Sequence, residues 1–175
     1  MTELKITDFG GKGDGVFDNT NSFKAAFEEL AKNGGGTLVV DSGTWLTGPI
    51  DLIENSTLEL KEGTELSFIT DPNAYPPAFT RWEGVECYAM HALLRAADCK
   101  NVKVTGRGTI NGNGNAWWEL KKAKKDSGQT RPVEPYELAL AKMNPGYENQ
   151  AGGGGGRETQ FLRPCLVEFI NCQHV

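Results

Sequence analysis

The stretch from residue 93 to residue 118 constrains the fold most, because it holds three short apolar runs separated by polar residues and glycines. The runs lie at about 93–97, 102–105 and 109–110, and each is too short for a helix, so each is predicted to be a strand. No Asn-Gly turn stands between two long alternating runs, so a tight antiparallel hairpin is not expected here. Short strands joined by bends are typical of one coil of a parallel β-solenoid.

A solenoid repeats, and residues 93–102 align with residues 166–175, with Asp98 opposite Asn171 just before a turn. A weaker copy covers residues 50–68. The aligned apolar or thiol pairs are Leu93 with Leu166, Leu94 with Val167, Cys99 with Cys172, Val102 with Val175, Leu58 with Val102, Leu60 with Val104 and Leu66 with Ile110. The copies lie further apart than the roughly 20–30 residues of a bare coil, so each interval is expected to carry an inserted loop.

Residues 18–34 predict a helix that covers the first coil. Its expected N-cap oxygens belong to Asp18, Thr20 or Asn21, and Gly34 is expected to end it. Its apolar side chains recur at helical spacing: Phe23, Ala26, Phe27, Leu30 and Ala31. An amphipathic helix of this kind protects the open end of a solenoid. Strands are predicted at 5–9, 37–40, 45–46, 50–52 and 56–60, and Asn55 is expected to stack with turn asparagines of other coils.

Two segments interrupt the strand pattern. Residues 71–92 are rich in prolines, aromatic residues and charges, which suit sugar stacking and carboxylate pairing, although Phe79 and Trp82 could instead pin the loop to the solenoid wall. Residues 113–163 begin with Trp117 and Trp118 and predict helices at about 119–125 and 136–143. Five glycines follow at 152–156, which form either a flexible flap over a cleft or a plain surface loop.

Composition excludes several classes of protein. The net charge of −5 and the lack of a basic face argue against nucleic acid and anionic membranes as partners. The sequence has no apolar run long enough for a membrane span and no signal-peptide core, so the chain is expected to be cytoplasmic as given, or secreted or periplasmic after loss of a signal. Its four cysteines have no zinc-ligand spacing and are expected to be free, buried thiols, with no metal and no cofactor.

Several motifs in order along the chain resemble one family. They are residues 9–15 (Phe-Gly-Gly-Lys-Gly-Asp-Gly), 34–40, 46–50 (Leu-Thr-Gly-Pro-Ile), 81–84 (Arg-Trp-Glu-Gly), 106–114 with the following Trp117 and Trp118, and 163–164 (Arg-Pro). Together they resemble the N-terminal part of glycoside hydrolase family 28, the polygalacturonases, particularly bacterial exo-acting members. Asn111 departs from this pattern, because the family usually has aspartate there.

The resemblance implies an all-β fold, a right-handed parallel β-helix with an N-terminal capping α-helix. Residues 1–175 are then the N-terminal portion of a single β-helix domain. Its cap covers about 1–36, its coils about 37–70, 93–112 and 164–175, and its inserted loops about 71–92 and 113–163.

Polygalacturonases cleave α-1,4-galacturonosyl bonds by inversion, with carboxylates about 6.5–9.5 Å apart. The family carries them in Asn-x-Asp and Asp-Asp motifs, supported by Gly-His-Gly and Arg-x-Lys, and none of the four occurs in this sequence. The resemblance therefore implies a fragment with no catalytic residues of its own, whose partners are pectin or oligogalacturonides and either the C-terminal remainder or a second copy at the open last coil. The alternative is a non-catalytic carbohydrate-binding or structural β-helix module.

Candidate substrate-binding residues lie in or beside the two inserted segments, where aromatic and basic side chains concentrate. They are Arg81, Trp82, Trp117 and Arg163. Arginine can pair bidentately with a carboxylate, and tryptophan can lie against a sugar ring.

Overall fold

The computed structural model describes residues 2–82, 84–128, 132–146 and 163–175. The chain forms two compact units. Unit 1 comprises Met1–Ile69, Leu93–Gly112 and Val167–Val175, and unit 2 comprises Thr70–Ala92 and Asn113–Leu166. The chain leaves unit 1 twice, and both times it departs after a strand of the same sheet and returns to a strand of the next one.

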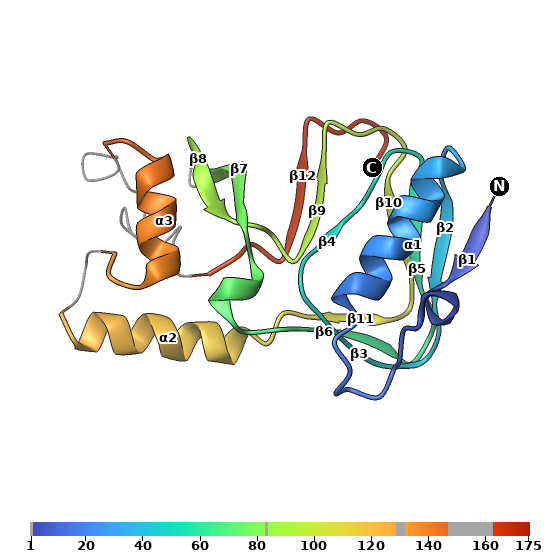
Figure 1. Cartoon of the computed structure of the whole chain (residues 1–175), viewed down its shortest axis with the longest axis horizontal. Helices are drawn as coiled ribbons and strands as arrows, with labels where there is room; N and C mark the ends of the chain where they lie inside the picture. The colour runs from blue at the N-terminus through green and yellow to red at the C-terminus, as the bar shows by residue number, and fades with distance from the viewer. Residues whose placement is uncertain (1, 83, 129–131, 147–162) are drawn as a thin grey trace. The chain divides into compact units, whose positions relative to one another are not determined.

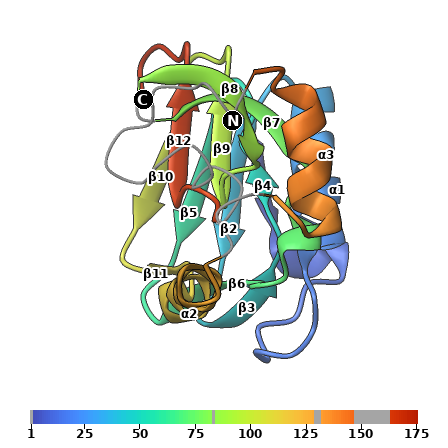
Figure 2. The same ribbon diagram turned by 90° about the vertical axis from the view of Figure 1, so that its left-hand side faces the viewer.

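Unit 1 is built from short parallel strands that wind through three sheets. They are β1 (Glu3–Lys5), β2 (Gly36–Val40), β3 (Gly43–Thr47), β4 (Ile50–Asp51), β5 (Ser56–Leu60), β6 (Thr64–Phe68), β9 (Leu94–Ala97), β10 (Lys103–Gly106), β11 (Thr109–Asn111) and β12 (Val167–Ile170). The sheet orders are β1-β2-β5-β10, β3-β6-β11 and β4-β9-β12, so each circuit adds one strand to each sheet (Figure 2). This is a right-handed parallel β-helix, as the sequence predicted.

The core of unit 1 is a set of apolar columns that run from coil to coil. Alternate residues of β5 and β6 are buried, which is the period of a strand with one face inward. The in-register buried pairs are Leu38 with Leu58, Trp45 with Leu66 and Ile50 with Leu94. Each of these six side chains is at most 2% exposed, so the columns exclude water along their length.

The predicted register is confirmed in two of the three sheets. Leu66 pairs with Ile110 and Leu94 with Val167. In the first sheet the prediction is wrong by two residues, because Leu58 pairs with Val104 rather than with Val102. A slip of two residues keeps every side chain on its original face, so the alternation of apolar residues cannot detect it.

The predicted strand at 5–9 is wrong beyond its first residue. Strand β1 ends at Lys5, and Ile6–Phe9 form the 3-10 helix η1, which Gly10 ends in the left-handed conformation at φ 76°. The Asp8 carboxylate accepts a hydrogen bond from the Lys5 amide (3.3 Å), and Ile6 is buried. A side chain that bonds locally in this way favours a turn over an extended strand.

Helix α1 (Thr20–Lys32) caps the β-helix as predicted. It packs on η1, β1, β2 and β4, and it lies along the first coil in Figure 1. The buried face is made of Ser22, Phe23, Ala26, Phe27 and Leu30. Gly34 follows the helix with φ 77°, a conformation that glycine adopts without steric cost.

Turn asparagines stack between coils, which confirms the predicted ladder. Asn55 and Asn101 both have positive φ (58° and 56°), and the Asn101 amide donates to the Asn55 side-chain oxygen (2.8 Å). Asn171 donates in the same way to Asp98 (3.0 Å). These polar pairs hold successive bends in register outside the apolar columns.

The apolar pattern of the coils predicts eight residues that point into the core, namely Leu58, Leu60, Leu94, Val102, Val104, Ile110, Leu166 and Phe169, and four of them are buried. Leu58, Leu60, Leu94 and Val102 are at most 2% exposed. Val104 and Ile110 are only half-buried, and Leu166 and Phe169 are exposed. Val104, Ile110 and Phe169 nevertheless stack in register on the buried residues Leu58, Leu66 and Ala96 of the preceding coil, as the sequence predicts. Strands β10, β11 and β12 stand at the edges of their sheets, where a neighbouring strand covers one side alone.

Replacing Gly106 with alanine should destabilise unit 1 by about 2 kcal/mol, because its φ of 102° disfavours any side chain and the new Cβ would overlap the Leu60 carbonyl oxygen. Urea unfolding measures the loss. Gly114→Ala is the matched control, since Gly114 begins a helix and its Cβ meets no atom within 4 Å. Equal midpoints for the two variants would contradict the prediction.

Unit 2 contains the 3-10 helix η2 (Pro72–Ala74), an antiparallel hairpin of β7 (Pro77–Trp82) and β8 (Val85–Met90), and helices α2 (Gly114–Asp126) and α3 (Pro135–Met143). The inserted segment at 71–92 thus contains an antiparallel hairpin that the sequence analysis did not predict. The helix predicted at 136–143 is confirmed, whereas α2 begins five residues earlier than the predicted residue 119. The five-glycine run at 152–156 lies outside the described residues.

Side-chain hydrogen bonds tie α3 to the hairpin. The Asn144 side chain accepts from the Tyr88 amide (2.8 Å) and donates to the Tyr88 carbonyl (2.9 Å), as a neighbouring strand would. It also donates to the carbonyl of Leu140 in α3 (2.8 Å). The Asn144 side chain thus forms hydrogen bonds with backbone groups of both β8 and the last turn of α3.

Candidate functional site

Arg163 contacts two indole rings within unit 2. Its guanidinium carbon lies 5.2 Å from the ring centroid of Trp118 and 5.9 Å from that of Trp82. The Lys121 ammonium lies 5.2 Å from the Trp118 ring as well. These four residues, Trp82, Trp118, Lys121 and Arg163, are called the Trp-Arg cluster below. All three contacts are within the range of cation–π attraction.

Three separate segments supply the Trp-Arg cluster. Trp82 is the last residue of β7, and Trp118 and Lys121 stand one helical turn apart on α2, where side chains at this spacing are neighbours. Arg163 comes from the segment that precedes β12. Trp118 is 57% exposed, so one of the two indoles offers much of its ring to solvent.

The environment of Arg163 suits an anionic ligand. Its Nε atom is buried and has no hydrogen-bond partner among the described residues. A guanidinium always carries its charge and presents in-plane N–H donors that match a carboxylate bidentately. The exposed Trp118 ring can pack against the apolar face of a sugar. The cluster can therefore hold a ring that bears a carboxylate.

The structure brings two of the four predicted binding residues, Trp82 and Arg163, together. Trp117 is 5% exposed, and its ring meets the edge of Tyr75 at 5.7 Å between centroids, so it anchors α2 inside unit 2. Arg81 is exposed, but it follows strand alternation and lies on the opposite face of β7 from Trp82. Trp118 and Lys121 were not predicted.

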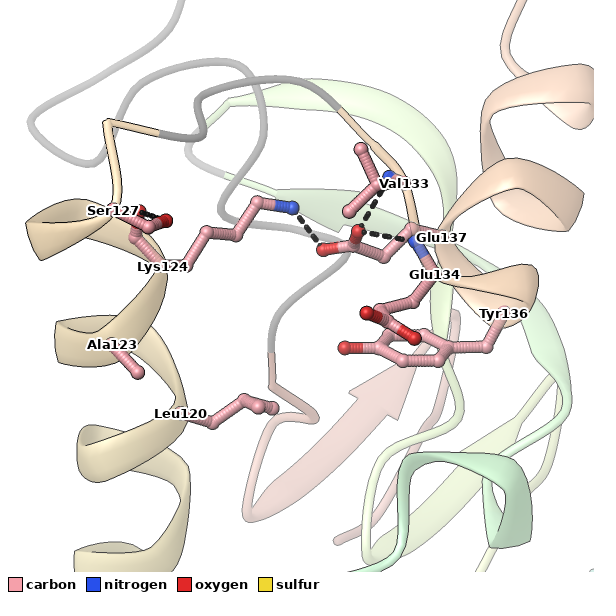
Figure 3. Close-up of a pocket in the computed structure, with 8 residues that line it drawn as sticks. All are labelled: Leu120, Ala123, Lys124, Ser127, Val133, Glu134, Tyr136 and Glu137. Carbon is pink, nitrogen blue, oxygen red and sulfur yellow. Dashed lines mark hydrogen bonds and ion pairs between the residues drawn. The ribbon is translucent and has the colours of Figure 1, made fainter.

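A pocket of about 240 Å³ lies between α2 and α3 (Figure 3). Its lining residues are Leu120, Ala123, Lys124, Ser127, Val133, Glu134, Tyr136 and Glu137. Lys124 reaches from α2 to form an ion pair with the Glu137 carboxylate, whose second oxygen accepts from the amides of Val133 (2.9 Å) and Glu134 (3.1 Å). Burial, followed by the charges of Glu137 and Glu134, raises the pKa of Tyr136 above its usual value. Lys124 and Glu137 thus pair with each other and join the two helices.

Asn111 forms an interaction that an aspartate could not form. Its Nδ2 atom donates to the Glu65 carboxylate across β6 and β11 (2.8 Å). An aspartate at this position would instead bring two carboxylates together.

Among the described residues, no three His, Cys, Asp or Glu side chains gather closely enough to hold a metal ion. Within the same part of the chain, no helix is long and apolar enough to cross a membrane.

The three coiled parallel sheets and the capping helix place the chain in the class of right-handed parallel β-helix proteins. The sequence model of one family, glycosyl hydrolases family 28, matches residues 46–144. The chain belongs to that family.

Named relatives agree with this assignment. The chain is 33% identical over 144 residues to a "Probable polygalacturonase" of Vitis vinifera, covering 77% of this chain and 28% of that protein. It is 32% identical to an "Exo-poly-alpha-D-galacturonosidase" of Dickeya chrysanthemi, covering 74% and 22%. The crystal structure of a hyperthermoactive exopolygalacturonase from Thermotoga maritima superposes with a TM-score of 0.76 at 38% identity, covering 99% of this chain and 40% of that one. The chain thus spans about a quarter of the length of the two curated relatives, from Vitis vinifera and Dickeya chrysanthemi.

Proposed function

We propose that the chain is the N-terminal part of a pectin-degrading glycoside hydrolase that cleaves α-1,4-galacturonosyl bonds with inversion. The observation that carries this proposal is the family match over residues 46–144, because it includes strands of unit 1 together with the hairpin and helices of unit 2. We further propose that residues 1–175 belong to a single β-helix domain in which the segments of unit 2 are insertions.

The proposed role of unit 2 is to bind uronate units of the substrate. Trp82 and Arg163 would contact the sugar together with Trp118 and Lys121, and the arginine would pair with the uronate carboxylate. Arg81 is proposed to contact the substrate from the other face of β7. Trp117, although predicted as a contact, would act by holding α2 in place.

Purified chain of residues 1–175 is expected to release no reducing ends from polygalacturonate. Inverting hydrolysis needs one carboxyl group as acid and another as base, and the family motifs that supply them are absent from this sequence. A reducing-sugar assay against a mock preparation measures this. Release that follows the protein through successive purification steps would contradict it and would require carboxylates other than those of the family motifs.

Substrate binding is tested with the same purified chain by calorimetric titration with oligogalacturonates. Arg163→Ala and Trp82→Ala should each weaken binding about tenfold, since a charged hydrogen bond or a stacking contact contributes about 1.4 kcal/mol. Arg107→Ala is the charge-matched control, because the Arg107 side chain is 83% exposed and forms an ion pair with an equally exposed glutamate, Glu62.

Neutral galactose oligomers of equal length provide the second comparison. Arg163→Ala should affect their binding much less than that of the acidic oligomers, because no carboxylate is present to pair with the arginine. Equal losses for acidic and neutral oligomers would mean that Arg163 has a structural role and does not pair with the carboxylate. The family assignment would be unaffected.

A further inference from the structure

Two free cysteines, Cys99 and Cys172, occupy equivalent positions on consecutive coils of unit 1. Strands β9 and β12 pair in register from Leu94 with Val167 to Ala97 with Ile170, and Lys100 continues the same register by bridging to Gln173. The Gln173 amide donates to the Cys99 carbonyl (3.0 Å). The two cysteines therefore stand directly next to each other across the coil boundary.

Their side chains take the same course. The Cys99 thiol donates to the Ala97 carbonyl (2.9 Å), two residues back, and the Cys172 thiol to the carbonyl of Ile170 (3.2 Å), also two residues back. Each sulfur also faces a carbonyl of the preceding coil, at Leu52 (4.0 Å) for Cys99 and Ala96 (3.5 Å) for Cys172. Equivalent contacts on both coils mean that the two sulfurs are stacked.

The spacing of the coils suits a covalent bond between these sulfurs. Neighbouring strands lie about 4.8 Å apart, and disulfides join residues whose Cα atoms are about 4.4–6.8 Å apart. Both side chains are half-buried, as is Cys165, so the prediction of buried thiols is confirmed for Cys87 alone. A reagent can therefore reach the Cys99 and Cys172 side chains without unfolding of the core.

We propose that Cys99 and Cys172 form a disulfide between consecutive coils when the protein meets a small-molecule disulfide such as oxidised glutathione. The Cys172 thiol, on the coil at the sheet edge, loses its proton and attacks one glutathione sulfur, and the other glutathione leaves as a thiol. The Cys99 thiol then loses its proton and attacks the Cys172 sulfur of this mixed disulfide. The second glutathione leaves as a thiol, so two protein thiols are oxidised and one small disulfide is reduced to two thiols.

The order of attack agrees with the surroundings of Cys99. Burial raises the pKa of its thiol, and the neighbouring Cys172 and the carboxylates of Glu54 and Asp98 raise it further. Cys99 is therefore the resolving thiol, which reacts once the mixed disulfide holds the second sulfur beside it.

The bond would fasten β12 to β9 beside contacts that already join them. The Arg95 Nε atom donates to the Glu168 carboxylate (2.9 Å) in a pair whose side chains are at most 17% exposed. The asparagine–aspartate pair Asn171 and Asp98 lies one residue before the cysteines. Since the bond closes the chain from residue 99 to residue 172, it limits the freedom of the unfolded chain across α2 and α3.

The test treats the purified chain with excess oxidised glutathione and then maps peptides without reduction. The expected result is a loss of two free thiols, a linked peptide pair containing Cys99 and Cys172, and a thermal midpoint raised by about 5–10 °C that dithiothreitol reverses. Cys99→Ser and Cys172→Ser should each abolish the linked pair and the shift. Cys87→Ala and Cys165→Ser should keep both.

Three outcomes would overturn the proposal. They are a lasting glutathione adduct on Cys172 with Cys99 still free, a link from either cysteine to Cys165, and covalent dimers on a non-reducing gel in place of the intramolecular bond. The circular dichroism spectrum of each serine variant before oxidation shows that it is folded, so absence of the linked pair reports on the cysteine and not on the fold.

Discussion

Replacing Asn19 with leucine should cost about 4 kcal/mol of unfolding free energy, because a fully buried amide that satisfies four backbone groups is lost. Its Oδ1 atom accepts from the Lys12 amide (2.8 Å). Its Nδ2 atom donates to the carbonyls of Lys12 (3.0 Å), Phe17 (2.9 Å) and Leu46 (3.0 Å). The side chain thus ties the glycine-rich loop before α1 to strand β3.

Leucine has nearly the same shape as asparagine, so the expected loss comes from unpaired polar groups and not from a cavity. For a chain of this size, the thermal midpoint should fall by about 10 °C, as followed by circular dichroism. Asn33→Leu is the control, because Asn33 is an exposed residue that ends the same helix. A midpoint for Asn19→Leu within 2 °C of that of the control corresponds to a stability difference on the order of 0.5 kcal/mol. It would contradict the prediction and show that water replaces the lost amide.

Asn19 also shows what the sequence could not reveal about the cap. The helix itself followed from apolar spacing, but Asp18, Thr20 and Asn21 were expected to supply the N-cap oxygen. Asp18 does supply such an oxygen, because its carboxylate accepts from the amide of Thr20, the first residue of α1 (2.9 Å). Asn19 stands at the N-cap position but points its side chain away from the helix, and the Thr20 hydroxyl accepts from the amide of Gly48 (2.7 Å). These bonds join residues distant in sequence, and no local pattern encodes them.

The β-helix was predictable because its physics is local and repetitive. Each strand is short, buries alternate residues and ends at a bend, and the repeated Leu94 and Val167 positions mark successive coils. The hairpin of unit 2 was not predicted because prolines precede it. Pro77 is the first residue of β7, a position where proline costs no ladder hydrogen bond.

Two of the four predicted binding residues, Trp82 and Arg163, lie in the Trp-Arg cluster, and the error over Trp117 and Trp118 comes from the predicted start of α2. Both tryptophans were placed before a helix that was expected to begin at residue 119. Because α2 begins at Gly114, helical periodicity applies to both, and Trp117 falls on one face with Leu120 and Lys124. Trp118 falls on another face, with Lys121. The start of α2 at Gly114 therefore determines which of the two tryptophans is exposed and contacts Arg163.

Replacing Lys124 with methionine should destabilise the α2–α3 pairing by about 3–5 kcal/mol. The Glu137 side chain is 1% exposed and the Lys124 side chain 12%, so the substitution leaves an ionised carboxylate buried without its partner. Hydrogen exchange of the α3 amides measures the loss locally, which matters because α3 belongs to unit 2. Lys125→Met is the matched control, since Lys125 is an exposed neighbour on the same helix.

The double variant Lys124→Met with Glu137→Gln separates charge from packing. In the native protein Glu137 accepts hydrogen bonds from the amides of Val133 and Glu134. Glutamine keeps an oxygen that can accept both, but it carries no charge. Most of the protection lost in Lys124→Met should therefore return, because neutralising the remaining partner removes the cost of an unpaired buried charge. A double variant that exchanges as fast as Lys124→Met would mean that the lysine stabilises the two helices through the packing of its methylene chain, and not by neutralising Glu137.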